Sequence, residues 1–169
     1  MRDPYNGIDG GLPLTVTSDD FTDGGRLPLA CTAEFVGAGG QDATPQLSWS
    51  EVPEGTRSIY IHMYDPDAPT PAGWWHWSVL NLPADLRSLD HNANGKLPDG
   101  ALVLKNDGGG YGYLGSAPPA GHGPHRYFFT VHALDTVLDL DDDTSATKAA
   151  FVAREHVLAR GTIVGLWEN

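Results

Sequence analysis

Two aspartates at the end of a predicted strand are the first residues that could do chemistry. Asp65 and Asp67 flank a proline in the sequence DPDAP, which directly follows the β-branched and aromatic run 58–65. Strand alternation places Asp65 on the same face as Ile59 and Ile61, so its carboxylate should face a protected region. A carboxylate in that position needs a hydrogen-bonding or charged partner.

The next apolar run, residues 74–82 (WWHWSVLNL), offers His76 as that partner. In a regular strand His76 shares its face with Trp74 and Ser78, and the two remaining tryptophans point the other way. Nearby carboxylates raise the pKa of an imidazole and burial lowers it. If the carboxylates dominate, His76 is a cation at neutral pH.

A long loop, residues 107–123, precedes the third group of polar residues. It holds seven of the 21 glycines and the pair Pro118-Pro119, so it is not expected to form regular structure. Small residues at 115–117 allow close backbone approach to a ligand and could present N–H groups to an anion. His125 and Tyr127 then share one strand face. Together with the aspartates and His76, this set suits a small ligand with anionic and cationic parts, such as a phosphorylated amine.

Several short strands and one late helix must position these groups. Gly and Pro supply 34 of the 169 residues, which favours turns over long helices. Asp143–Ser145 offer helix caps and Gly161 a helix stop. We therefore predict one predominantly antiparallel β domain over residues 1–169, with a helix packed on it. The predicted strands are 12–16, 46–49, 58–65, 74–82, 101–105, 126–134 and 162–167, and the predicted helix is 145–160.

Composition excludes several classes of partner. The net charge of −12 and the lack of any Lys/Arg cluster argue against binding to nucleic acid or to anionic lipid surfaces. No apolar run approaches the length of a membrane span or of a signal-peptide core, so a cytoplasmic location without membrane insertion is expected. The single Cys31 cannot form an intrachain disulfide and is expected to be a buried apolar residue. The acidic run 139–143 is expected to be a solvated helix entry.

Three motifs in order resemble the phosphatidylethanolamine-binding protein family, which includes the Raf kinase inhibitor proteins, and in particular its bacterial and archaeal branch. They are DPDAP, GWWHWSVLNLP and GSAPPAGHGPHRYFFTVHALD, and they lie within residues 47–135. The resemblance implies an antiparallel Greek-key β-sandwich with a C-terminal helix and a small pocket for phosphate or phosphoryl-ethanolamine-like groups. No cofactor or metal is implied. The matching positions give these ligand-binding residues: Asp65, Asp67, Trp74, His76, Ala117, Pro119, His125 and Tyr127.

The chain departs from the animal members at two positions. Trp77 stands where Phe is common, and Ala117 stands where Gly is common, which stiffens the loop but keeps the N–H donor. Inhibition of a kinase or a protease depends on a partner-specific surface, so it does not follow from the resemblance alone. The expected activity is regulatory binding of a small anion, and the protein is not expected to be an enzyme.

Two alternatives remain open from the residues. A hydrolase could use His76 or His125 as base with Asp65 as orienter, but the sequence offers no activated nucleophile. A zinc-like site could use His122 and His125 together with His76 and Asp65, although the spacing of His122 and His125 is not that of two ligands on one helical face. We expect His122 to be an exposed loop residue. Of the remaining histidines, two are expected to be structural, His62 and His132, and two carry no signal, His91 and His156.

Overall fold

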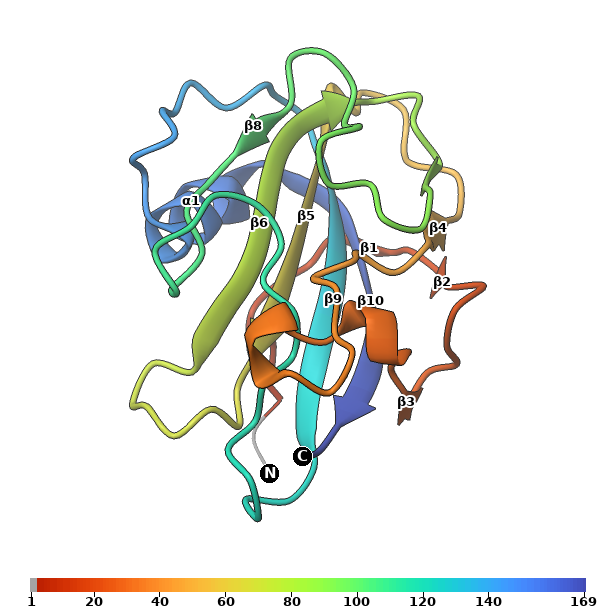
Figure 1. Cartoon of the computed structure of the whole chain (residues 1–169). Coiled ribbons are helices and arrows are strands. Elements are labelled where there is room, and N and C mark those ends of the chain that lie inside the picture. The colour runs from red at the N-terminus through yellow and green to blue at the C-terminus, as the bar shows by residue number, and fades with distance from the viewer. Residues whose placement is uncertain (1–2) are drawn as a thin grey trace.

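A twisted sheet built from four long strands forms the centre of the computed structural model, which describes residues 3–169; the first two residues of the predicted 1–169 domain lie outside the described part (Figure 1). Its strand order is β1-β10-β9-β5-β6-β8, and β3 also pairs with β10. The four long strands pair antiparallel, whereas β1 and β3 pair parallel with β10. The strands of this sheet are β1 (Leu12–Pro13), β3 (Gly25–Arg26), β5 (Ser58–Asp65), β6 (Trp74–Pro83), β8 (Leu102–Val103), β9 (His125–Leu134) and β10 (Val157–Trp167).

A smaller sheet covers one face of the large one. It has the order β2-β4-β7, formed by Val16–Thr17, Leu47–Trp49 and Ser88–Leu89. The main core lies between the two sheets: Leu47 packs in the same buried cluster as Ile61 and Val131 of the central strands. Burial of such side chains is the dominant stabilising contribution in a fold of this kind. The prediction of a mainly β fold with two layers of strands is confirmed.

The opposite face of the large sheet is covered by α1 (Ala146–Ala153), as Figure 1 shows. Ala149 and Ala153 pack there with Tyr60 and Leu80 in a second buried cluster. Because both faces of β5 are covered, its apolar residues run continuously instead of alternating with polar ones. The hydroxyl of Ser145 caps the helix by accepting a hydrogen bond from the backbone N–H of Lys148 at 3.2 Å, as the sequence predicted.

The prediction of a helix over 145–160 is wrong in its second half. The α-helix ends at Ala153, a short 3₁₀ helix follows at Arg154–His156, and the rest joins β10. Burial alternates with period two along β10, and its backbone pairs with β9 over its whole length. Gly161 does not stop a helix. It lies within β10, and glycine is needed there because a Cβ would come within 2.2 Å of the carbonyl oxygen of Leu14.

Strand alternation also fails at His76, because β6 carries an irregularity there. Met63 pairs with Trp77 and Tyr64 pairs with Trp75, which leaves His76 as the extra residue. Trp77 therefore points into the core between the sheets, whereas Trp75 lies on the helix-covered face. The prediction that both tryptophans share the face opposite His76 is wrong.

The remaining predicted strands agree with the structure apart from their ends, whereas β3 and β7 were not predicted. The segment predicted as one strand over 12–16 forms the separate strands β1 and β2, and the strand predicted over 101–105 is shortened to β8. The loop 107–123 has no regular strand or helix. Two further 3₁₀ helices, Leu29–Cys31 and Glu34–Val36, lie before β4. The aspartates of the run 139–143 are exposed, and Cys31 is buried, as expected.

Candidate functional site

A cavity of about 200 Å³ lies where β5, β6 and β9 meet the loop 107–123, and we call it the strand-end cavity. Seven of the eight predicted site residues line it; Asp67 does not. Their burial differs: His76 and His125 are buried, whereas Pro119 is an exposed rim residue. The seven lining residues are Asp65, Trp74, His76, Ala117, Pro119, His125 and Tyr127.

Asp65 holds His125 in place at the base of the cavity. One carboxylate oxygen accepts hydrogen bonds from the backbone N–H groups of Asp67 and Ala68, at 2.8 and 3.0 Å. The other accepts from Nδ1–H of His125 at 2.7 Å. The side chains of Asp65 and His125 are 3% and 2% exposed, so this pair is shielded from solvent. Asp65 therefore acts as an orienting partner, and Nε2 is the nitrogen of His125 that remains for other contacts.

Nε2 of His125 lies 2.7 Å from Nδ1 of His122. His122 is exposed, as predicted, but it is not isolated, since its imidazole continues the chain of contacts from Asp65 to the surface. The two facing nitrogens are too close to hold a zinc ion between them, because each Zn–N bond needs about 2.0–2.1 Å. Within residues 3–169, no group of three or more His, Cys, Asp or Glu side chains is arranged to bind a metal ion.

His76 is fixed in one orientation by the loop that follows the glycine-rich segment. Its Nδ1–H donates to the carbonyl oxygen of Leu114 at 2.9 Å, and its ring lies edge-on to Tyr127 at 5.3 Å between centroids. Burial lowers the pKa of His76, and the Leu114 carbonyl and the Asp65 charge offset this only in part. Burial thus outweighs the carboxylates, and neutral His76 keeps Nε2 as an open acceptor.

Tyr127 provides an open donor in the wall of the strand-end cavity. Its side chain is buried, and its O–H has no acceptor within the described residues. Burial raises the pKa of Tyr127, and the charge of Asp65 adds to the rise, while the adjacent backbone of Ala117 lowers it. The phenol therefore stays protonated at neutral pH and is ready to donate to a ligand.

The small residues of the loop serve the chain's own packing more than the cavity. A Cβ on Gly115 would come within 2.2 Å of the Thr32 backbone, so glycine is needed for the approach of two backbone segments. The N–H of Gly115 donates to Asp42 at 2.6 Å, and that of Ser116 donates to the Cys31 carbonyl at 3.3 Å. Only the Ala117 N–H, beside the Tyr127 oxygen, remains from the predicted anion nest.

Asp67 turns away from the strand-end cavity and binds Arg126. Its carboxylate accepts hydrogen bonds from the backbone N–H, Nε and Nη2 of Arg126 at 3.0, 2.7 and 2.8 Å. Burial raises the pKa of Asp67, but the hydrogen bonds and the charge of Arg126 lower it more, so the net shift is downward. The structure thus places Asp67 behind the cavity, where it ties the DPDAP loop to β9.

Several lining residues were not identified from the sequence. The cavity is also bounded by Phe35, Ala68, Pro69, Thr70, Leu114 and Pro118. Phe35 comes from a segment far from the three motifs and is 73% exposed, so no sequence pattern marked it. The residues adjoining DPDAP and the Pro-Pro pair could have been included from their position beside predicted site residues.

The other histidines lie away from the strand-end cavity. His62 and His132 are buried on the helix-covered face of the sheet. His91 and His156 form surface contacts with Asp20 and Asp135, both at 2.8 Å.

These features define a class: a two-layered β protein with a small, partly buried polar cavity at the ends of its central strands. The chain matches the family model "Phosphatidylethanolamine-binding protein" over residues 17–168. It is 43% identical to the UPF0098 protein YbhB of Escherichia coli over 158 residues, which cover 91% of this chain and 99% of YbhB. The protein belongs to the phosphatidylethanolamine-binding protein family.

A solved structure agrees with this assignment. The crystal structure of E. coli YbcL, described as a member of the mammalian PEBP family, superposes with a TM-score of 0.88 at 38% identity and covers 92% of this chain and 98% of YbcL. A relative from Mycobacterium tuberculosis, LppC, carries the word lipoprotein in its name; it is 32% identical over 93% of this chain and 73% of its own length. In the described part of this chain, no helix is long and apolar enough to cross a membrane.

Proposed function

We propose that the strand-end cavity binds a small phosphorylated ligand, phosphate itself or a phosphorylated amine headgroup, and that this binding is regulatory. The observation that carries the proposal is the meeting of two buried histidines and a phenol without an acceptor around one cavity. Buried polar groups normally find partners within the protein. A donor left open at a cavity wall is therefore suited to a ligand oxygen.

The cavity chemistry divides between the two ends of such a ligand. The Tyr127 hydroxyl and the Ala117 N–H can donate to phosphoryl oxygens. Nε2 of His76 can accept from a protonated phosphoryl oxygen, or it can take up a proton and then donate. Trp74 offers an indole face to an ammonium group. The volume of about 200 Å³ suits a headgroup and not the acyl chains of a whole lipid.

We further propose that the protein is a binding protein and not an enzyme. Thr70 carries the single aliphatic hydroxyl among the lining residues, and that hydroxyl donates to the Gly73 carbonyl at 2.5 Å. The Cys31 thiol is buried outside the cavity, and burial raises its pKa to about 12. A hydrolytic mechanism would require an activated nucleophile in contact with a base.

We also propose that the protein inhibits a kinase or a protease and that it is located in the cytoplasm. The exposed Phe35 at the cavity rim supports a protein partner that covers this opening. The overall acidity supports function away from anionic surfaces.

The test is ligand-dependent thermal stability of the wild type and of His76→Ala. At about 100 times the Kd, a ligand adds about 2.7 kcal/mol to the free energy of unfolding, which raises the Tm by about 5–10 °C for a chain of this length. Phosphate or O-phosphorylethanolamine should produce that rise in the wild type and in the surface control His91→Ala, but not in His76→Ala. Equal stabilisation of all three proteins would refute the assignment of the site. Phosphoester hydrolysis that is lost in His76→Ala would instead support a hydrolase.

A further inference from the structure

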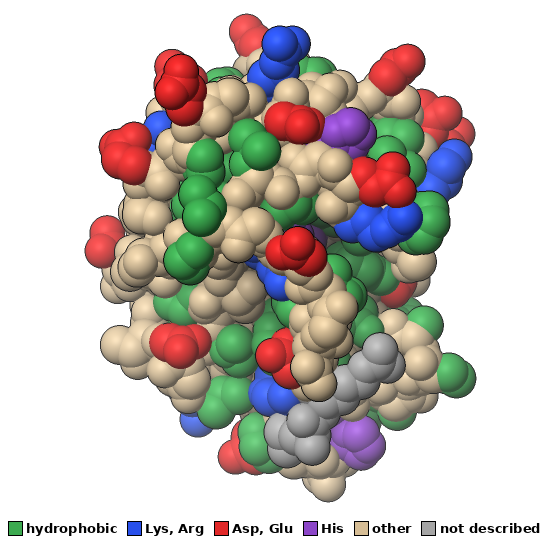
Figure 2. Space-filling view, turned by 180° about the vertical axis from the view of Figure 1, so that it is seen from behind, with side chains coloured by type: hydrophobic (Ala, Val, Ile, Leu, Met, Phe, Trp, Pro, Cys, Tyr) green, Lys and Arg blue, Asp and Glu red, His purple; other side chains and the backbone are tan. Residues whose placement is uncertain are grey.

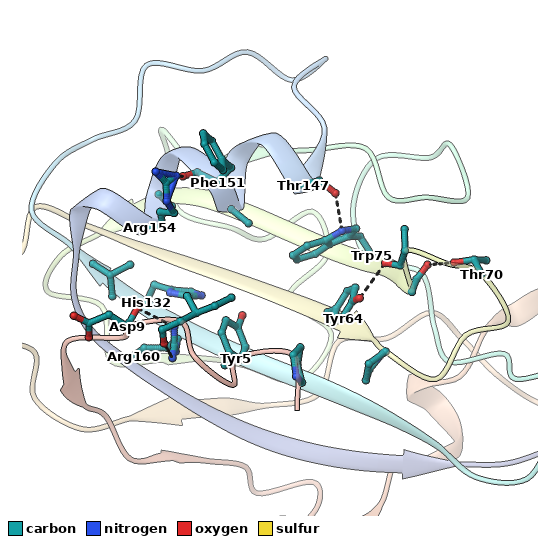
Figure 3. A pocket seen from close by; sticks show the side chains of 18 of the residues that line it. Tyr5, Asp9, Tyr64, Thr70, Trp75, His132, Thr147, Phe151, Arg154 and Arg160 are labelled. Carbon is teal, nitrogen blue, oxygen red and sulfur yellow. Dashed lines mark hydrogen bonds between the residues drawn. The ribbon is translucent and has the colours of Figure 1, made fainter. Parts of the chain in front are cut away.

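A second cavity, of about 470 Å³, lies on the helix-covered face of the large sheet, and we call it the sheet-face cavity (Figure 3). The segment 4–9 borders it on one side, α1 on another, and the loop 70–73 closes one end. Figure 3 shows Trp75 and Tyr64 at the end nearest Thr70, with Arg160 and His132 at the other. Its volume falls in the range of cavities that bind small organic molecules.

One end of the cavity is aromatic and held rigidly. The rings of Tyr64 and Trp75 lie 4.7 Å apart. Trp75 Nε1–H donates to the hydroxyl of Thr147 at 3.1 Å, and the Tyr64 hydroxyl donates to the carbonyl of Ala72 at 2.9 Å. Because these polar atoms are engaged by the helix and the loop, the rings can present apolar surface to the space between them.

Two buried histidines contact each other beside the cavity, and one of them, His132, lines it. His62 Nε2 hydrogen-bonds to the Tyr5 hydroxyl and lies 3.2 Å from His132 Nε2. Burial lowers the pKa of His62 to about 3, and it lowers the pKa of His132 well below its usual value, so both rings are neutral. His132 lines the cavity, and its Nδ1 has no hydrogen-bond partner within residues 3–169.

The cavity also carries a cation, Arg160, whose hydrogen bonds go to backbone carbonyls. Arg160 donates to the backbone carbonyls of Ile8 and Asp9 at 2.9 and 3.3 Å and lies 4.1 Å from the centroid of the Tyr5 ring. Across the described chain it forms no salt bridge, in a protein of net charge −12. In the view of Figure 2, acidic side chains are scattered over the surface among apolar and uncharged groups.

Two other charged residues line the cavity. Arg154 is already engaged, since it donates to Glu155 at 2.7 Å and to the Phe151 carbonyl at 3.1 Å. The carboxylate of Asp9 accepts from the Gly11 N–H at 3.0 Å and partly opposes the charge of Arg160. The formal charge of the lining is therefore positive, with Arg160 as its unpaired member.

We propose that the sheet-face cavity binds a flat aromatic monocarboxylate, with its ring against Trp75 and Tyr64 and its carboxylate toward Arg160. The rigid aromatic end selects a planar apolar body. The cation without an ionic partner selects one negative charge. This site is on the other face of the sheet from the strand-end cavity. Binding of a carboxylate here can therefore be tested independently of phosphate binding there.

The probe is 2-naphthoate, measured by isothermal titration calorimetry and by the NMR shift of the Trp75 indole N–H. Its neutral isostere 2-naphthamide should bind about fivefold more weakly, because it lacks the charge. Ala150→Phe, which places a ring inside the cavity from α1, should abolish naphthoate binding and leave phosphate binding unchanged. Arg160→Gln should weaken naphthoate binding to the level of the amide.

Asp9→Asn keeps the acceptor for Gly11 and removes the opposing charge, so it should strengthen naphthoate binding about twofold even if Arg160→Gln fails to fold. Equal affinity for acid and amide, or unchanged binding in Ala150→Phe, would overturn the proposal. So would loss of naphthoate binding in His76→Ala, no heat or shift at millimolar naphthoate, or a Trp75 shift that tracks self-association in sedimentation.

Discussion

Replacing Tyr127 by Phe tests whether the phenol is an open donor for a ligand. The substitution removes one oxygen and keeps the ring that packs against His76. The Tyr127 O–H is buried and has no acceptor in the described chain. We therefore expect Tyr127→Phe to stabilise the free protein and to weaken phosphate binding, two effects that a purely structural tyrosine would not combine.

The magnitudes follow from the two environments of this hydroxyl. A buried polar group without a partner costs about 1–3 kcal/mol, so its removal should raise the free energy of unfolding by about 1 kcal/mol and the Tm by about 2–4 °C. A hydrogen bond to a charged group contributes about 1.5–3 kcal/mol. Its loss should weaken phosphate binding by about tenfold or more.

Tyr113 is the matched control, because it is a second buried tyrosine close to the same loop. Its hydroxyl donates to the Cys31 carbonyl at 3.0 Å, so this phenol has the acceptor that Tyr127 lacks. Tyr113→Phe should lower the free energy of unfolding by about 1 kcal/mol and leave phosphate affinity unchanged. Urea unfolding and calorimetric titration with phosphate measure both quantities for each variant.

The two expected effects of Tyr127→Phe can be refuted separately. If Tyr127→Phe destabilises the protein as much as Tyr113→Phe, the Tyr127 hydroxyl has a partner in the folded protein and is not an open donor. If phosphate binds both variants as tightly as the wild type, the hydroxyl does not contact the ligand.

Two further predictions concern pH. Because burial lowers the pKa of His76 and a bound anion would raise it, anion binding should take up a proton, and sulfate affinity should rise by up to about tenfold per unit as the pH falls from 8 toward the pKa of the free protein. Calorimetry in buffers of different ionisation enthalpy measures the proton uptake. A sulfate affinity that does not change with pH would contradict the predicted protonation of His76. His62 has a folded pKa of about 3, lowered mainly by burial, so between that value and about 6.5 the unfolded chain binds a proton that the folded chain does not. Stability should therefore fall with falling pH, by up to about 1.4 kcal/mol per unit, and urea unfolding at pH 7, 6 and 5 should show a smaller slope for His62→Gln.

Most of the strand-end cavity could be predicted because its residues fall in a few short segments at strand ends. Asp65 and His125 end long apolar runs, His76 lies two residues inside the end of another, and strands of that kind are recognisable from local composition. The resemblance of the three motifs then indicated which strand ends meet. Phe35 could not be predicted as a lining residue, because its place at the cavity depends on where a distant segment packs.

The wrong predictions for residues 154–160 and for His76 have one cause. Pairing between distant segments overrides the local preference for helix or for regular strand alternation. Residues 154–160 contain good helix formers, but β9 needs a partner along its free edge, and β10 supplies those backbone hydrogen bonds. The irregularity at His76 likewise arises from the register of β6 against β5. No pattern within either segment encodes its partner.

By itself, the sequence determined the mainly β class, the long strands and the polar residues at their ends, because hydrophobic periodicity and turn residues act over a few positions. Only the tertiary structure decided that Asp67 turns away to Arg126, that His76 and Trp77 occupy a strand irregularity, and that Tyr5, Trp75 and Arg160 surround a second cavity. These features join residues up to about 150 positions apart, and their geometry is set by packing and by hydrogen bonds that exist only once the chain has folded.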